Sequence, residues 1–190
     1  MLVVFDFDKT LVNYDTTMPF FKFCCTNKIR WRFAYLFYLF LKVLSKVGMI
    51  SVKKEKEIGL FLFCPKDKNK FILKCKEFSE TIKLNTLYTQ HYLNHLKNND
   101  TLIIASASFK YYLKQLFPNA IIIGSTIKLN KSGQIIGIKN HPFKKEKSDI
   151  LKSIGYSKID KFYTDSKNDI PTSLLADKTY WVKNGKIINK

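Results

Sequence analysis

Two aspartates near the start of the chain, Asp6 and Asp8, carry carboxylates that could act together in a reaction. They directly follow the apolar run 2–5, which predicts a buried strand. Side chains two residues apart on an extended chain project to the same side, here at the carboxyl end of that strand. One such carboxylate can attack as a nucleophile while the other donates and then accepts a proton, so the pair suits a two-step covalent reaction.

A second acidic cluster, Asp165 and Asp169, follows the later apolar run 162–164. Either pair alone is more often a helix cap or a turn than a metal site. At the ends of two strands of one sheet, however, these carboxylates can face the cleft where ligands of open α/β sheets bind. Carboxylates in one cleft repel each other and an incoming phosphate unless cations offset the charge. We therefore expect Mg²⁺, which prefers oxygen ligands and often coordinates substrate phosphate.

Two further side chains could bind an anion. Ser106 follows the apolar run 102–105, where its hydroxyl and nearby backbone N–H groups could hold a phosphate oxygen. The alternative is that Ser106 or Ser108 caps the helix that follows. Lys147 lies on the apolar stripe of the helix predicted over 148–154. A lysine on an inward stripe is unusual unless it reaches an anion, so Lys147 is a candidate for the same site.

The elements that must position these residues alternate between strands and helices. Four short apolar runs separated by helical patterns indicate βαβ units and an open, mainly parallel α/β sheet flanked by helices. The runs are 2–5, 102–105, 120–123 and 162–164, and the helical patterns include 111–117 and 148–154. Hairpins are predicted over 127–138 and in the tail around 184–185. Residues 16–84 show helical periodicity without strand alternation, which predicts a helical cap inserted after the first strand, with residues 1–15 and 85–190 as the core.

The segment 28–48 of this cap predicts an amphipathic helix. Helical spacing places Phe33, Phe37 and Phe40 on one face, and residues 16–54 contain no Asp or Glu. We favour packing of this face on neighbouring elements, where the rings would fill the cleft wall. The alternative is peripheral contact with an anionic membrane, with the rings in lipid and the lysines at the headgroups. Lysines interrupt the apolar stretch, which is too short to span a bilayer.

The composition limits the class of protein and its partners. With 46% hydrophobic residues and few Gly and Pro, the chain is neither disordered nor fibrous. Thirty-three basic and fifteen acidic residues give a net charge of +18, which suits nucleic acid, an anionic membrane or a phosphorylated substrate. Because only Arg30 and Arg32 are arginine, we expect no specific nucleic-acid binding. Four cysteines without a CxxC pair, and an opening without a secretory signal pattern, predict a cytoplasmic protein, with association at the inner face of the membrane as the alternative.

In their order along the chain, these residues resemble the motifs of the haloacid dehalogenase (HAD) superfamily, in its phosphoserine-phosphatase-like subclass. Asp6-Phe7-Asp8-Lys9-Thr10 resembles the DxDxT motif, Ser106 the serine or threonine motif, Lys147 the lysine motif, and Asp165-Ser166-Lys167-Asn168-Asp169 the acidic motif. A lone DxDxT motif is weak support, whereas four motifs in order at strand ends are specific. The resemblance covers both ends of the chain and most of the core, and the cap is only weakly informative.

The resemblance implies a phosphatase with a Rossmann-like HAD core that uses Mg²⁺. Asp6 would form an aspartyl-phosphate, and Asp8 would protonate the leaving alcohol and then activate water. The other implied roles are phosphate binding by Thr10, Ser106 and Lys147, and Mg²⁺ binding by Asp6, the Asp8 backbone carbonyl and Asp165, with Asp169 as a further ligand or an orienting group.

Departures from the family pattern bear on the substrate. The second motif reads Ser106-Ala107-Ser108 where phosphoserine phosphatases usually have Ser-Gly-Gly, and Lys9 stands where glycine is common. Asp15 lies where those enzymes bind a substrate amine, although a helix cap is its alternative role, and Asn168 is a further candidate for substrate contact. A cap arginine for a substrate carboxylate is not evident.

We therefore expect a small phosphorylated metabolite, such as an amino-alcohol phosphate or a phosphoserine-like compound. The alternative is a membrane-associated lipid phosphate phosphatase. It is suggested by the acidic motif and the tail 180–185, which also resemble bacterial phosphatidylglycerophosphate phosphatases with an apolar, membrane-associated cap region. A basic binding module without turnover is a third hypothesis.

Overall fold

The computed structural model describes residues 1–188 of the 190, and within them a seven-stranded sheet has the order β4-β3-β2-β1-β5-β6-β7. The strands are β1 Leu2–Phe5, β2 Thr101–Phe109, β3 Ile121–Leu129, β4 Ile135–Asn140, β5 Ile159–Thr164, β6 Ala176–Lys183 and β7 Lys186–Ile187. Strands β1, β2, β3, β5 and β6 are parallel, while β4 and β7 pair antiparallel at the two edges. The predicted open, mainly parallel α/β sheet is confirmed.

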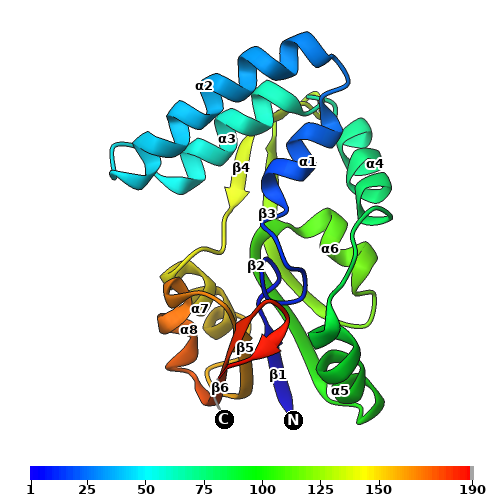
Figure 1. Ribbon diagram of the computed structural model, residues 1–190, viewed down its shortest axis with the longest axis vertical. Coiled ribbons are helices and arrows are strands. Elements are labelled where there is room, and N and C mark those ends of the chain that lie inside the picture. The colour runs from blue at the N-terminus through cyan, green and yellow to red at the C-terminus, as the bar shows by residue number, and fades with distance from the viewer. Residues whose placement is uncertain (189–190) are drawn as a thin grey trace.

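Helices flank both faces of the sheet, as Figure 1 shows. Those between β1 and β2 are α1 Thr17–Cys24, α2 Lys28–Lys46, α3 Val52–Phe63, α4 Lys68–Ser79 and α5 Leu93–Lys97, the last continuing a π-helical turn at Tyr88–Tyr92. The others are α6 Lys110–Leu116, α7 Lys145–Ser153 and α8 Ile170–Ser173, the last preceded by a 3₁₀ turn at Lys167–Asp169. Helices α7 and α8 lie on one side of the sheet, and α4, α5 and α6 lie on the other.

The sheet is buried on both faces, which explains its uninterrupted apolar runs. In β1, the side chains of Val3 and Phe5 belong to the larger core beside α1 to α6, whereas Val4 belongs to the smaller core beside α7. All three side chains are fully buried. Leu151 of α7 is also part of the smaller core, so the apolar stripe that carries Lys147 faces the sheet.

Strand β3 is longer than predicted, because the third predicted strand and the first arm of the predicted hairpin form one continuous element. It leaves the parallel sheet and goes on to pair antiparallel with β4. Asn130 closes the turn between them, since its side-chain oxygen accepts a hydrogen bond from the Gln134 backbone N–H at 2.8 Å. The hairpin reaches the helical segment, where the Ile135 N–H donates to the Lys66 carbonyl oxygen at 2.8 Å.

The helices α1 to α4 occupy the predicted cap segment, residues 16–84, which contains no strand. Close aromatic packing joins them, and Gly59 of α3 makes this possible because a Cβ there would lie 2.3 Å from the ring of Phe21 in α1. Helix α4 also packs on α6, where the rings of Phe78 and Tyr112 have centroids 5.4 Å apart. The helical segment is therefore tied to the sheet by α4 and by the β3–β4 hairpin.

Helix α2 lies on the outside of this segment (Figure 1). Its Tyr38 and Leu41 are buried, but Phe33, Phe37 and Phe40 are 74%, 49% and 57% exposed. The favoured interpretation, in which this aromatic face packs on neighbouring elements, is wrong. The helix packs on α3 through its other face, which carries large side chains as well. Among the described residues, no helix combines the length and the apolar character needed to cross a membrane.

Candidate active site

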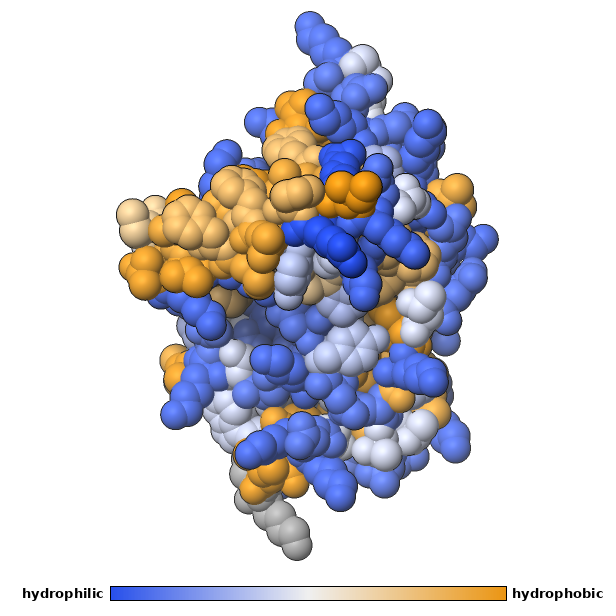
Figure 2. Space-filling model, turned by 45° about the horizontal axis from the view of Figure 1, so that its top comes forward, coloured by the Kyte–Doolittle hydropathy of each residue, from blue (hydrophilic) through white to orange (hydrophobic). Residues whose placement is uncertain are grey.

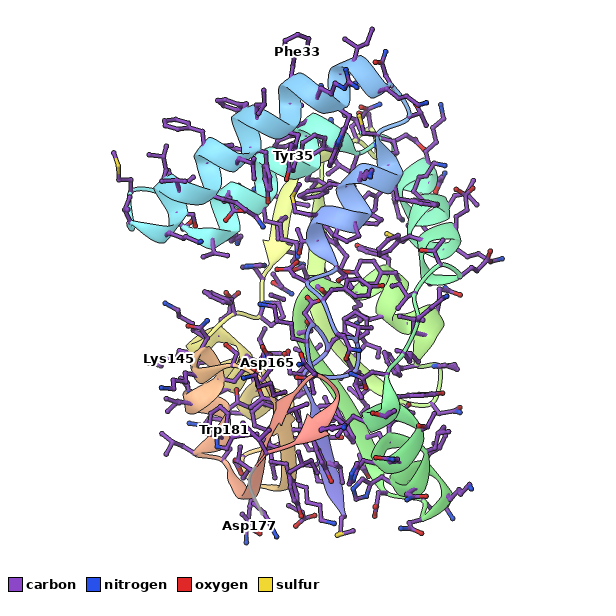
Figure 3. All side chains as sticks on the ribbon, in the orientation of Figure 1. Phe33, Tyr35, Lys145, Asp165, Asp177 and Trp181 are labelled. Atoms are coloured by element: carbon purple, nitrogen blue, oxygen red, sulfur yellow. The ribbon has the colours of Figure 1, made fainter. Side chains whose placement is uncertain are left out.

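The predicted site residues converge on one cleft between the carboxyl ends of β1, β2 and β5 and the helices α2 and α3. All of them except Thr10 line it, namely Asp6, Asp8, Asp15, Ser106, Lys147, Asp165, Asn168 and Asp169. Figure 3 labels Asp165 at the end of β5, in the middle of the molecule. The carboxyl ends of parallel strands meet at one edge of the sheet, which is why residues far apart in the chain arrive together.

Lys147 joins two carboxylates at the bottom of the cleft. Its Nζ lies 2.9 Å from Asp6 Oδ1 and 2.7 Å from Asp169 Oδ1, and its side chain is 4% exposed. Burial raises the pKa of Asp6, and the charge of Lys147 opposes this rise. Burial alone would lower the pKa of Lys147, but the two carboxylates outweigh it and the net shift is upward. Lys147 is therefore a fixed cation next to Asp6.

The Asp8 carboxylate is held by hydroxyl groups from two other elements. Its Oδ1 accepts hydrogen bonds from the Thr16 backbone N–H at 2.8 Å and from Thr16 Oγ1 at 2.7 Å, and its Oδ2 accepts one from Ser108 Oγ at 2.6 Å. Thr16 Oγ1 also lies 2.9 Å from the Tyr112 hydroxyl. Burial raises the pKa of Asp8, while these hydrogen bonds oppose the shift. The carboxylate is thus oriented and is protonated more readily than an exposed one.

Ser106 and Ser108 lie within β2, in a stretch where the pairing with β3 is irregular. The Ser106 hydroxyl accepts a hydrogen bond from the Ser108 backbone N–H at 3.1 Å, and its side chain is buried. Helix α6 begins two residues after Ser108, and its N-cap position is Phe109, without a side-chain cap. The alternative in which either serine caps this helix is therefore wrong, because both hydroxyls are turned to the cleft network.

The loop after β1 contains Lys9 and Thr10. Lys9 has φ +57°, a conformation that favours glycine and costs a lysine about 1 kcal/mol. Its backbone N–H donates to the Tyr14 carbonyl oxygen at 3.2 Å, which holds the turn. Thr10 lies behind the loop, and its buried hydroxyl has no hydrogen-bond partner within residues 1–188. The structure therefore accommodates the departure at Lys9 and leaves Thr10 outside the cleft wall.

Asp15 and Asn168 lie at the rim of the cleft and are exposed. Asp15 Oδ1 accepts a hydrogen bond from the Thr17 backbone N–H at 2.9 Å, at the start of α1. Asp15 thus satisfies a backbone N–H in the first turn of α1, next to the N-cap residue Thr16, and it also lines the cleft. The Asn168 backbone N–H donates to Ser166 Oγ at 3.2 Å. This leaves the side-chain amide of Asn168 for other partners.

The residues at the bottom of the cleft fit Mg²⁺. Within residues 1–188 there is no cluster of three His, Cys, Asp or Glu that would form a metal site by itself. Mg²⁺ is commonly bound by one or two carboxylates and completes its shell with water and substrate phosphate. Here the Asp6 and Asp165 carboxylates and the Asp8 backbone carbonyl could supply the protein ligands. Burial raises the pKa of the Asp165 carboxyl, and the charge of Lys9 only partly opposes this rise. Asp169 already bonds Lys147 and Thr164 Oγ1 (2.7 Å), so it suits the orienting role.

On the helical side of the cleft stands a residue that the sequence analysis missed, Lys56 of α3. Its Nζ donates to the Ala107 carbonyl oxygen at 2.5 Å and lies 4.4 Å from the centroid of the Phe109 ring. Burial lowers the pKa of Lys56 to about 8. Beside it, His141 is buried, with Nδ1 2.9 Å from Ser125 Oγ, and burial together with Lys56 lowers its pKa to about 3. The cleft therefore carries a cation from each side and a neutral histidine.

The site and the fold can be compared with known proteins. No curated protein matched the chain. A protein of unknown function from Bordetella pertussis Tohama I has a TM-score of 0.77 at 17% identity, covering 95% of this chain and 88% of that one. A phosphoserine phosphohydrolase-like protein from Francisella tularensis subsp. tularensis SCHU S4 gives 0.66 at 16% identity over 95% and 86%. A phospho-aspartyl intermediate analogue of phosphoserine phosphatase gives 0.62 at 18% identity over 95% and 85%.

At these identities the solved structures establish a shared fold. The sequence model of the haloacid dehalogenase-like hydrolases, in contrast, matches residues 3–173, which run from β1 to α8 and include every predicted motif. The chain therefore belongs to the haloacid dehalogenase-like hydrolases, as its ordered motifs predicted.

Proposed function

We propose that the chain is a Mg²⁺-dependent phosphomonoester hydrolase that works through a phospho-aspartate intermediate. The observation that carries this proposal is the Asp6–Lys147 pair at the end of β1, with 2.9 Å between carboxylate oxygen and Nζ, next to the separately oriented Asp8. A nucleophile beside a fixed cation and a second carboxylate held for proton transfer are the two parts that the reaction needs.

In the first step, Asp6 Oδ attacks phosphorus, the ester P–O bond breaks, and Asp8 gives its proton to the leaving alcohol. In the second step, Asp8 takes a proton from water, whose oxygen attacks phosphorus, releasing phosphate and restoring Asp6. Lys147 would offset the charge on Asp6 and on the transferred group, and the Ser106 hydroxyl would donate a hydrogen bond to a phosphoryl oxygen. Bound Mg²⁺ would neutralise phosphoryl charge in both steps. The raised pKa of Asp8 favours its acid role.

For the substrate, we propose a small phosphorylated metabolite. Asp15 at the rim could bind an amine, as in an amino-alcohol phosphate. The sequence shows no cap arginine for a substrate carboxylate, but Lys56 supplies a cation on the helical side of the cleft. Lys56 could therefore bind the carboxylate of a phosphoserine-like compound. The phosphoserine phosphatases among the solved structures have this fold, which is consistent with the choice.

A lipid phosphate is the second candidate substrate. Helix α2 favours it, because Tyr38 and Lys42 line the cleft from this helix while its opposite face is apolar and exposed. We also propose that the protein works in the cytoplasm, since its four cysteines are all free thiols, as in a reducing compartment.

The test is phosphate release from a panel of phosphomonoesters, namely phosphoethanolamine, phosphoserine, sugar phosphates and phosphatidylglycerophosphate, each with Mg²⁺ and with EDTA. Asp6→Asn should abolish release, whereas Asp177→Asn, at the far end of β6 in Figure 3, should leave it unchanged. Release that survives Asp6→Asn would refute the phospho-aspartate mechanism. Absence of release from the whole panel would favour the binding module.

A further inference from the structure

One face of α2 carries an unbroken row of exposed apolar side chains. They recur every three to four residues and are each 49% to 74% exposed, namely Ile29, Phe33, Phe37, Phe40, Val43 and Val47. We call this set the α2 ridge. Figure 2 shows it as a band of hydrophobic residues along the outer helix, and Figure 3 shows Phe33 pointing away from the molecule. Contiguous exposed apolar surface of this extent marks an interaction site.

The exposure of the ridge does not result from poor packing of the helix. The opposite face of α2 is anchored by Tyr38, whose hydroxyl donates to the buried Glu55 at 2.6 Å, and by Trp31, whose ring lies 4.9 Å from that of Phe63. Arg30 donates to the Leu62 carbonyl oxygen at 2.8 Å and ties the start of the helix to α3. The orientation of the helix is therefore fixed, and the ridge is presented outward.

The charges around the ridge identify what covers it. Lys28, Arg32 and Lys46 are exposed and lie along one flank at helical spacing, on the side where Lys42 lines the cleft. No acidic residue occurs from 16 to 54, and the chain has a net charge of +18. A second copy seated on the ridge would bring two rows of cations together. An anionic bilayer instead complements both the apolar row and its basic flank.

We propose that the α2 ridge docks the protein on an anionic phospholipid membrane, with the helix axis in the plane of the interface. The 19 residues of α2 span about 28 Å, so the ridge would lie along the surface and not cross it. The basic flank would then lie at headgroup level, and the cleft would open within about one helix diameter, roughly 10 Å, of the headgroups. This inference does not depend on the proposed hydrolase activity.

Flotation of the full chain with vesicles tests the proposal. Vesicles of 70% phosphatidylcholine and 30% phosphatidylglycerol should bind the protein at least about tenfold more tightly than pure phosphatidylcholine, and salt should weaken binding. The variant Phe33→Ser/Phe40→Ser should lose about tenfold or more in partitioning. The matched control, Leu73→Ser/Leu174→Ser, removes side chains that are 54% and 80% exposed elsewhere and should bind like the wild type. Circular dichroism and thermal melting establish that all variants are folded.

Two outcomes would overturn the proposal. If anionic vesicles do not bind the protein, or bind the ridge variant as well as the wild type, the ridge does not contact lipid. If sedimentation shows a dimer that the ridge variant converts to a monomer, without a change in flotation, the ridge is a self-association surface. Activity on a soluble phosphomonoester should be the same for the ridge variant and the wild type, so failure of docking and failure of the proposed hydrolase function are distinguishable.

Discussion

Replacing Lys147 by Met removes the cation that separates two buried carboxylates. In the native protein, Nζ lies 2.9 Å from Asp6 and 2.7 Å from Asp169, and all three side chains are at most 10% exposed. Met retains most of the side-chain volume, so the change is chiefly one of charge. Removing one partner of a buried ion pair leaves an uncompensated charge and typically costs about 3–5 kcal/mol. Lys147→Met should therefore lower the free energy of unfolding by about that amount at pH 8 in EDTA.

The loss should depend on pH in a defined direction. Without Lys147, the pKa of the Asp6 carboxyl in the native state should rise further above the unfolded value, because the cation that opposes the effect of burial is removed. Between the unfolded pKa and the raised native pKa, the native state binds more protons than the unfolded state, so stability falls as pH rises. In the wild type the pKa of Asp6 is raised to about 8, so the two native states differ in protonation mainly above that pH. The difference between wild type and variant should thus be larger at pH 9 than at pH 5, where the Asp6 carboxyl is protonated in both.

Urea unfolding followed by circular dichroism measures both quantities. The matched control is Lys145→Met, because Lys145 is exposed on the first turn of the same helix (Figure 3) and its loss should change stability by less than about 0.5 kcal/mol. The double variant Lys147→Met/Asp169→Asn should recover part of the stability lost in the single variant. A penalty below about 1 kcal/mol at pH 8, or the same penalty at pH 9 as at pH 5, would refute the idea that Lys147 holds the carboxylates together.

Three further predictions follow from distances in the structure. Ser108→Ala removes the 2.6 Å hydrogen bond to the Asp8 carboxylate and should lower kcat by about ten- to a hundredfold in steady-state assays. An unchanged kcat would contradict the role of Ser108 in orienting Asp8. Gly59→Ala places a Cβ about 2.3 Å from the Phe21 ring and should reduce the free energy of unfolding by about 1–3 kcal/mol in urea, although alanine favours helices. Lys56→Met removes a cation from the helical side of the cleft and should raise KM about tenfold for an anionic substrate, with little change in kcat. A loss confined to kcat would instead place Lys56 in the chemical step.

The acidic half of the site was predictable because it follows from local sequence and one rule of topology. Asp6 and Asp165 each come directly after a buried apolar run, and the carboxyl ends of parallel strands share one edge of the sheet. Lys147 was found by helical register, since it lies on the stripe that packs on the sheet. These signals are short in range, so a single sequence is sufficient to read them.

The residues that orient Asp8 could not be found in this way. Thr16 and Ser108 are 92 residues apart, and Tyr112 lies a further turn along, yet their hydroxyl groups meet. Nothing in the sequence near Asp8 specifies which side chains will approach it, because that depends on how α1 and β2 are placed. Serine and threonine are also common at helix caps, which offered a sufficient local explanation for Ser108.

The amphipathic character of α2 was predictable, but the side that is buried was not. Periodicity grouped Phe33, Phe37 and Phe40 correctly, and the usual expectation is that the more apolar face packs inward. Here both faces are rich in large side chains, and Tyr38 is the buried aromatic residue because it reaches Glu55. When two faces are almost equally apolar, the choice depends on the partner helices, and these are remote in sequence.

Lys56 and Lys147 show that the same sequence signal can have opposite electrostatic outcomes. Each lies on the inward stripe of a helix, and each side chain is almost fully buried. Lys147 finds two carboxylates within 2.9 Å, which raise its pKa, whereas Lys56 finds a carbonyl oxygen and a ring, so burial prevails and lowers its pKa to about 8. The charge next to Asp6 is therefore constant through the neutral range, while the charge on the helical side weakens as pH rises past 8. Above about pH 8, an anionic substrate would therefore keep its interaction with Lys147 and lose part of its interaction with Lys56.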